Sequence, residues 1–305
     1  MSRSIFIAAA LALAVTLPAA PAQAAGRTFV SAAGNDSNPC TITLPCRNLQ
    51  AAYNAVAANG QVEVLDPGNY GSLTITGPVN IQGHGWAGMS TNTGAAITIN
   101  SPNATDKIFI SGVVLDGLGI SGTNGIVFNS GGSLNVKDSV IRNFAIDGIT
   151  LNAAAPVRIS DTVVSDNTNV GINFQPGGAA DLTLERVQAI GNSNIGILIE
   201  GKNAPEGAVV TGTCADCVLS GNGDGFYSEG FLISAQPTGT IVNCKIANNN
   251  IGLVLSYSTV NLAQTTISNN KTDGFSTQFG TLKSFGNNFI TDTTNIGILM
   301  SIAQR

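Results

Sequence analysis

The fold is decided by the stretch Ile241-Val242-Asn243-Cys244-Lys245-Ile246-Ala247-Asn248-Asn249-Asn250-Ile251-Gly252-Leu253. Within it, Ile241, Cys244 and Ile246 are spaced by three residues and then by two. A step of two is the strand period and places both side chains on one face. A step of three indicates a corner, after which the side chains point inward again. The stretch therefore predicts two short strands that meet at a corner, followed by a glycine that opens the next strand.

Both features of this stretch recur along the chain. The glycine and large apolar residue return in steps of 22 to 29 residues. They begin at Gly125, Gly148, Gly171, Gly196, Gly225, Gly252, Gly274 and Gly297. The three-then-two spacing recurs at Val136/Ser139/Ile141, Ile159/Thr162/Val164, Leu184/Val187/Ala189, Cys214/Cys217/Leu219, Leu262/Thr265/Ile267 and Phe285/Asn288/Ile290. We expect Leu115/Leu118/Ile120 to begin the series.

Repeats of this length indicate coils that stack and bury a continuous core. We expect an all-β protein, a three-sided parallel β-helix of about ten coils at the ~4.8 Å strand spacing. Asn143, Asn167, Asn192 and Asn222 precede successive glycines, and their amides can bond one coil to the next. Low charge (10%) and 36 glycines agree with many short strands and tight turns.

The first 24 residues have the features of a signal peptide. Arg3 precedes an apolar run, 5–17, and Ala22-Gln23-Ala24 fits the small-x-small cleavage pattern. We expect residues 1–24 to be removed and the mature chain to be periplasmic or extracellular, with no transmembrane segment. The net charge of −5 argues against nucleic acid as a partner.

Residues 25–61 differ from the repeat. Residues 47–58 have the spacing of a short amphipathic helix, which we expect to cap the open end of the core. Cys40 and Cys46 lie beside this helix in an exported chain, and we expect them to form a disulfide. The parallel β-helix then occupies residues 62–305, with strand 62–65 first.

The repeat resembles those of the pectate-lyase-like superfamily of right-handed parallel β-helix proteins. The resemblance rests on runs such as 241–253 and on Asp66-Pro67-Gly68-Asn69-Tyr70, and it covers residues 28–305. It is strongest to small exported bacterial members of unassigned activity. It implies the right-handed fold, whereas the superfamily's activities range from lyases and hydrolases to inert rods.

The hydrolase motifs of this superfamily are incomplete here. Asp147-Gly148 matches the end of an N-T-D-G motif, but Ala145 and Ile146 replace its first two residues, and no paired carboxylates follow one coil later. Hydrolysis requires two facing carboxyl groups, so Asp147 alone is a weak catalytic candidate. No arginine-rich lyase signature is present. His84 has no carboxylate near it in the sequence, so we expect a turn histidine.

One charged cluster stands out on the predicted surface. The residue inside each three-residue step faces outward, so Gly117, Asp138, Asp161, Arg186 and Asp216 should form a column. Lys137 and Glu185 should lie in the neighbouring column. Stacked Asp138 and Asp161 are candidates for catalysis or for holding calcium, with Lys137, Glu185, Arg186 and Asp216 as binding residues. The alternative is an ordinary solvated ionic corner, which we favour.

Three further cysteines fall in inward columns. Cys214, Cys217 and Cys244 can be small buried hydrophobic residues, which we favour, and Cys217 and Cys244 can instead form a coil-to-coil disulfide. A redox role for the Cys214–Cys217 spacing has no helix N-terminus to support it.

The sequence leaves three functions open. We favour a non-catalytic protein that binds a glycan or forms part of the cell envelope, without an evident cofactor. The alternative is a divergent polysaccharide lyase or glycoside hydrolase, with calcium as its candidate ion. A third is a spacer that self-associates through its C-terminal end. A glycan-binding protein should expose aromatic residues on one face, for which the candidates are Tyr227, Phe231, Tyr257 and Phe279.

Overall fold

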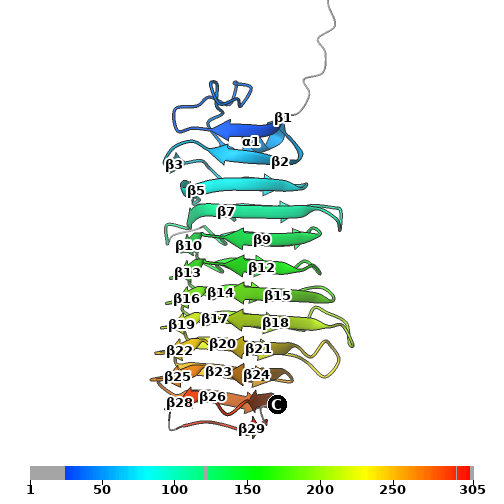
Figure 1. The fold of residues 1–305 in the computed structure, drawn as a ribbon, viewed down its shortest axis with the longest axis vertical. Helices are drawn as coiled ribbons and strands as arrows, with labels where there is room; N and C mark the ends of the chain where they lie inside the picture. Colours follow the sequence, from blue (N-terminus) through cyan, green and yellow to red (C-terminus); the bar gives the residue numbers. More distant parts are fainter. Residues whose placement is uncertain (1–24, 120–121, 293, 303–305) are drawn as a thin grey trace, which may run out of the picture.

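The computed structural model describes residues 25–119, 122–292 and 294–302. The chain winds into a rod of stacked parallel strands, with the N-terminal coil at one end and the C-terminal coil at the other (Figure 1). The nine-stranded third face corresponds to about nine turns, close to the expected ten. This is an all-β, right-handed parallel β-helix, as the repeat and the superfamily resemblance together predicted. The predicted signal peptide, residues 1–24, lies outside the described residues.

Three faces make up the rod. The first face contains β1 (Ala25–Val30), β2 (Val56–Val64), β9 (Ser133–Lys137), β12 (Val157–Ser160), β15 (Ala180–Glu185), β18 (Val210–Ala215), β21 (Thr238–Val242), β24 (Thr259–Ala263), β27 (Thr281–Ser284) and β29 (Leu299–Ser301). The second contains β3 (Gly68–Asn69), β10 (Val140–Arg142), β13 (Val163–Ser165), β16 (Gln188–Ile190), β19 (Val218–Ser220), β22 (Lys245–Ala247), β25 (Thr266–Ser268) and β28 (Phe289–Ile290). Strands β5 (Val79–Ser90) and β7 (Lys107–Asp116) run through both of these faces.

The third face is a separate nine-stranded sheet. It contains β4 (Leu73–Ile75), β6 (Ile97–Asn100), β8 (Ile126–Ser130), β11 (Ile149–Leu151), β14 (Val170–Phe174), β17 (Ile195–Glu200), β20 (Asp224–Glu229), β23 (Ile251–Ser256) and β26 (Asp273–Gln278). We name the corner between the first and second faces the first corner, and that between the second and third faces the second corner. The third corner, between the third face and the first face of the next coil, carries the loops 201–209 and 230–237.

The inward columns follow the predicted spacing through the middle of the rod. Val136, Ile159, Leu184, Cys214, Ile241 and Leu262 form one buried column in register. The series begins earlier than predicted, because Ile110 pairs with Val136 and Leu115 pairs with Ile141. The coil therefore uses Ile110/Val113/Leu115, and its corner residue is Gly112 in place of Gly117. Leu118 is 52% exposed, and Ile120 lies outside the described residues.

The last predicted triplet is also displaced. Ser284 pairs with Leu262, and one extra residue separates it from Asn288 and Ile290. The inward position predicted for Phe285 is thus occupied by Ser284, which is buried. An inserted residue at a corner shifts the side-chain phase without breaking the ladder of the next strand.

A buried asparagine ladder runs along the second corner. Asn167, Asn192, Asn222, Asn249 and Asn270 each donate from Nδ2 to the side chain one coil further on, at 2.7–3.1 Å. The last acceptor is the carboxylate of Asp292. Each side-chain oxygen also accepts a backbone N–H from the preceding coil. The ladder holds the polar turns inside the core without unpaired groups.

Asn143 does not belong to this ladder, contrary to prediction. Phe144 occupies the equivalent position, is fully buried, and donates its N–H to Asn167 Oδ1 at 3.0 Å. The side chain of Asn143 instead bonds Asp116 at 3.1 Å from a left-handed backbone. The repeated glycines are explained by the same corner. A Cβ on Gly196 would lie 2.6 Å from the oxygen of Gly225 and 2.8 Å from Nδ2 of Asn222.

The N-terminal end has the predicted helix, although it is shorter. Helix α1 (Leu49–Ala55) buries Leu49 and Ala52 against the first coils, and the chain enters β2 already at Val56. Residues 25–61 also contribute β1, which pairs with β2 beyond the expected first strand. Cys40 and Cys46 form the predicted disulfide, with a Cα–Cα distance of 4.6 Å. Within the described ranges, no helix has the length and hydropathy needed to cross a bilayer.

Candidate functional site

The first corner brings the predicted charged residues into one line. Gly112, Asp138, Asp161, Arg186 and Asp216 all have φ between 50° and 66°. A left-handed residue costs little for Gly and is better tolerated by Asp than by most side chains. Lys137 pairs with Ser160 across β9 and β12, which places Asp138 and Asp161 on successive coils as predicted.

Most charges in this line are paired. Arg186 donates to both oxygens of Asp161, at 2.6 and 2.9 Å, and it also pairs with Glu185. Its guanidinium holds the pKa of Asp161 below its usual range. Arg158 forms an ion pair with Glu185 from the first face. These contacts are those of an ionic corner, and they leave Asp161 without a free oxygen.

Asp138 is the most available carboxylate of the cluster. Its side chain is 54% exposed, and Lys137 Nζ lies 3.5 Å away. Asp216 accepts from Asn243 at 2.5 Å one coil further on. Among the described residues, one group of three or more His, Cys, Asp or Glu side chains has its ligand atoms close enough to share an ion, and that group consists of cysteines. No three carboxylates of these described residues are gathered in this way. Calcium at Asp138 and Asp161 therefore remains a prediction.

A hollow opens at the N-terminal end of this same corner. Gln82, His84, Ser111, Gly112 and Asp138 line a volume of about 390 Å³. Gly112 occupies the corner of the coil that lies between the coils of His84 and Asp138. A Cβ at Gly112 would lie 2.6 Å from the backbone N of His84. We name this feature the His84 hollow. His84 and Asp138 face it from corners two coils apart, about 10 Å along the axis.

His84 is oriented by a carboxylate, contrary to prediction. Glu63 Oε2 lies 2.7 Å from His84 Nε2, and the Glu63 side chain is only 14% exposed. Gln61 bonds the other Glu63 oxygen at 2.7 Å, which fixes the carboxylate in place. The pair lies 21 residues apart in sequence and meets because β2 and β5 are neighbours. A histidine held in this way can exchange a proton with a ligand in the hollow.

The chain's one tryptophan stands beside the hollow. Trp86 is 44% exposed, and its ring centroid is 6.1 Å from that of His84. Both residues lie in the register shift of β5 between Gln82 and Ala87, which swings this corner outward. An exposed indole next to carboxylate, amide and imidazole groups is a surface suited to a sugar ring.

Asp147 is buried and hydrogen-bonded to its own coil and to the next one. It is 3% exposed, and its oxygens accept from the side chains of Thr150, Asn169 and Asn173 at 2.9–3.0 Å. The backbone N–H of Val170 donates to it at 3.2 Å. Four donors on two coils occupy the carboxylate, so its role is to join the coils.

A carboxylate cluster on the third face was not predicted as a site. Glu200 and Glu229 are directly paired between β17 and β20, and Tyr227 donates to Glu229 at 3.3 Å. Lys202 neutralises Glu200 at 2.8 Å. Burial and the nearby Glu200 raise the pKa of Glu229, and burial also raises the pKa of Asp224 and that of Tyr227, the latter to about 12.

The pKa of Glu229 leads to a prediction about stability and pH. Because the pKa is higher in the folded state, the ionised carboxylate weakens the fold, and this penalty grows as the pH rises through that pKa. We expect Glu229→Gln to raise the urea midpoint at about pH 8 and to leave it unchanged at about pH 4. Asp181→Asn, at an exposed carboxylate, serves as the control. A Glu229→Gln variant that is less stable than the parent protein at about pH 8 would contradict a raised pKa of Glu229 in the folded state.

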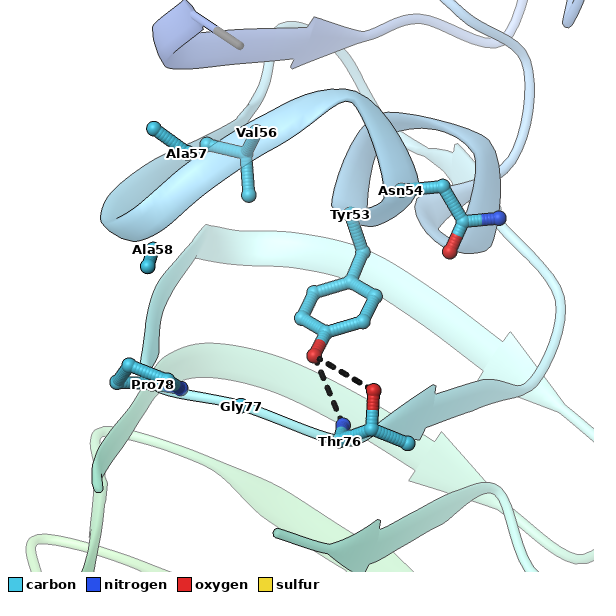
Figure 2. Close-up of a pocket in the computed structure, with 8 residues that line it drawn as sticks. All are labelled: Tyr53, Asn54, Val56, Ala57, Ala58, Thr76, Gly77 and Pro78. Carbon is cyan, nitrogen blue, oxygen red and sulfur yellow. Dashed lines mark hydrogen bonds between the residues drawn. The ribbon is translucent and has the colours of Figure 1, made fainter. Parts of the chain in front are cut away.

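A second hollow lies under helix α1. Tyr53, Thr76 and Pro78 are among the residues around its volume of about 480 Å³ (Figure 2). The Tyr53 hydroxyl accepts the backbone N–H of Thr76 at 2.8 Å, which ties the helix to the coil beneath it. The lining contains no charged side chain. This hollow therefore belongs to the cap, and its one acid–base group, the Tyr53 hydroxyl, is occupied in tying the helix to the coil.

The four predicted aromatic residues do not form one row. Tyr257 and Phe279 stack with centroids 5.1 Å apart, and Phe279 is 79% exposed. Tyr227 and Phe231 are only partly exposed, and Tyr227 turns to Glu229. The stacked pair is a second aromatic surface, near the C-terminal end of the rod and remote in sequence from Trp86.

Solved structures with the same architecture decide the type of β-helix. The crystal structure of pectate lyase Pel9A superposes with a TM-score of 0.57 at 13% identity, over 89% of this chain and 78% of that one. The chain has the pectate-lyase-like parallel β-helix fold. The A-module of the Azotobacter vinelandii mannuronan C-5 epimerase AlgE6 gives a TM-score of 0.53 at 14% identity, over 84% of this chain and 95% of that one.

A viral protein is similar to the same degree. ORF18 of Geobacillus virus E2 gives a TM-score of 0.56 at 13% identity over 88% of this chain, which spans 60% of the viral chain. No family model matches the sequence, and no curated protein matches it either. Likeness at these identities establishes the fold, and the site must be argued from this chain's own residues.

Proposed function

We propose that this protein is exported and binds a polysaccharide along its first corner, with the His84 hollow as the principal subsite. One observation carries the proposal. The hollow combines a carboxylate-held imidazole, an amide and an exposed carboxylate within one concave surface, and an exposed indole stands beside it. Carbohydrate sites need an apolar platform for the ring face and polar groups for the hydroxyls.

The distribution of charge supports the same surface. Only 31 of the 305 residues are Lys, Arg, Asp or Glu. Five of them, at positions 137, 138, 161, 185 and 186, continue the line of the hollow along the corner over three coils. A long polymer lying along the axis would meet these groups in succession. Two of the similar structures are, by their names, a pectate lyase and a mannuronan epimerase, which makes a polysaccharide ligand the natural class to test.

A second candidate function is a polysaccharide lyase or glycoside hydrolase. The observation in its favour is the His84–Glu63 pair, which faces Asp138 across the hollow. An imidazole oriented by a carboxylate is a competent general base, and a second ionisable group on the far side can return a proton.

Binding to immobilised neutral and acidic polysaccharides tests the first proposal. We expect Trp86→Ala to weaken binding by about tenfold through loss of the aromatic platform. Phe279→Ala is the matched control, because it removes an exposed aromatic from the other surface. Retained binding in the Trp86 variant and lost binding in the Phe279 variant would move the site to the stacked pair. Full binding by both variants would refute an aromatic platform.

Mass spectrometry of soluble products tests the second candidate on the same polymers. Oligosaccharides that form with the parent protein and not with His84→Gln would establish an enzyme with its base at this corner. Asp138→Asn should then also abolish products, whereas Asp147→Asn should act only through stability. The absence of products with the parent protein would leave binding as the function.

A further inference from the structure

Three cysteines meet inside the rod, away from the proposed site. Cys214, Cys217 and Cys244 are 1%, 1% and 4% exposed, and their Sγ atoms all lie within 4.8 Å of one another. Cys217 and Cys244 stack on successive coils, and Cys214 precedes Cys217 by one corner. From this geometry we propose that the three sulfurs form a buried site for one monovalent copper ion.

The arrangement uses all three sulfurs. A coil-to-coil disulfide between Cys217 and Cys244 would need only two, and these sulfurs are unbonded, whereas Cys40 and Cys46 are bonded to each other. Each Sγ lies within 4.8 Å of the Sγ atoms of both other cysteines. Three sulfurs at about 2.3 Å from a common centre would lie about 4 Å apart, so only small shifts are needed.

Hydrogen bonds hold the three sulfurs in place inside the core. The backbone N–H of Cys217 donates to Cys244 Sγ at 3.3 Å. The Cys244 thiol donates to the carbonyls of Cys214 and Val242 at 3.3 and 3.2 Å, and the Cys217 thiol donates to the carbonyl of Ala215 at 3.4 Å.

The choice of metal follows from the donors and the charge. Thiol ligands select soft ions, chiefly Cu(I) and zinc. Structural zinc takes four ligands, and no fourth His, Cys, Asp or Glu joins this group among the described residues. Cu(I) and one thiolate are together neutral, so binding with release of one thiol proton leaves no net charge in the apolar core. A divalent ion would need two thiolates for the same balance.

Access restricts when the ion can bind. The cluster lies in the middle of the stack, between β18 and β22, with intact coils on both sides. The ion must therefore enter as the coils form, and its binding free energy adds to that of folding. Refolding is the step at which loading can be measured.

The fold itself supplies conservative variants. The column of Cys217 and Cys244 also contains Thr162 and Val187, and the column of Cys214 contains Val136. Cys217→Val, Cys244→Thr and Cys214→Val thus place in each coil a residue that a neighbouring coil already buries. The triple variant keeps Cys40 and Cys46 and is the blank for copper bound elsewhere.

The test refolds the full chain anaerobically from denaturant, with ascorbate and Cu(I), and then removes loose metal with a chelator. We expect one copper per chain, ultraviolet copper–thiolate absorption and a higher midpoint of unfolding. In Cys217→Val the copper affinity should fall by more than the roughly 10- to 100-fold that loss of an outer-shell partner costs. Circular dichroism confirms that each variant is folded.

Three results would overturn the proposal. Copper that is retained equally by the triple variant would be bound elsewhere. Zinc retained in place of copper would contradict the choice of ion. A native mass lower by two hydrogens than the Cys40–Cys46 disulfide requires, with peptides of Cys217 and Cys244 joined, would show a second disulfide and no metal site.

Discussion

Replacing Asn222 by alanine is expected to lower the free energy of unfolding by about 3 to 5 kcal/mol. Its Oδ1 accepts the backbone N–H and the Nδ2 of Asn192, at 2.9 and 3.1 Å. Its Nδ2 donates to the carbonyl of Ala189 and to Asn249, both at 3.0 Å. Alanine leaves these partners buried with fewer hydrogen bonds, and water has no access to replace them.

Urea unfolding followed by circular dichroism measures this loss, with Asn250→Ala as the control. Asn250 lies in the next coil, is exposed, and accepts one hydrogen bond from Thr272 at its side chain. Its loss should change stability by no more than about 0.5 kcal/mol. Equal effects in the two variants would mean that the ladder contributes little to stability.

Gly196→Ala is expected to lower the free energy of unfolding by about 2 to 4 kcal/mol. The added Cβ would lie 2.6 Å from the Gly225 oxygen and 2.8 Å from Asn222 Nδ2. The first atom belongs to the backbone of the next coil, so relief requires the coils to separate. The loss is steric and should therefore be independent of pH.

Gly177→Ala is the matched control for this substitution. A Cβ at Gly177 meets nothing nearer than the Asn152 oxygen at 3.9 Å. Alanine there should leave stability unchanged or raise it by up to about 1 kcal/mol through the unfolded state. A Gly196 variant as stable as this control would show that the coil spacing adapts without cost.

The sequence predicted the fold because the same repeat recurs several times along the chain. It failed where a single coil departs from the rule. Leu115, Leu118 and Ile120 fit the three-then-two spacing as well as Ile110, Val113 and Leu115 do, and only the pairing with β9 and β10 separates them. Asn143 was misplaced for a similar reason, because Phe144 fills the ladder position with an apolar ring.

The candidate site was predicted in part. The line of Asp138, Asp161 and Arg186 follows directly from the corner spacing. The partner of His84 could not be found, because Glu63 becomes its neighbour through the register of β2 and β5 and no local motif marks the contact. Glu200 and Glu229 pair across coils of unequal length in the same way.

The asparagine ladder gives the rod an electrical direction. In each side chain of the series Nδ2 donates to the next side chain toward the C-terminal end, while the side-chain oxygen accepts from the preceding coil, so the amide dipoles align instead of cancelling. The row behaves as a helix macrodipole does, with its partially positive end at the last coil. Asp292 places a carboxylate at that end, as an acidic residue does at a helix N-terminus. The stack of similar coils therefore has two electrostatically different ends.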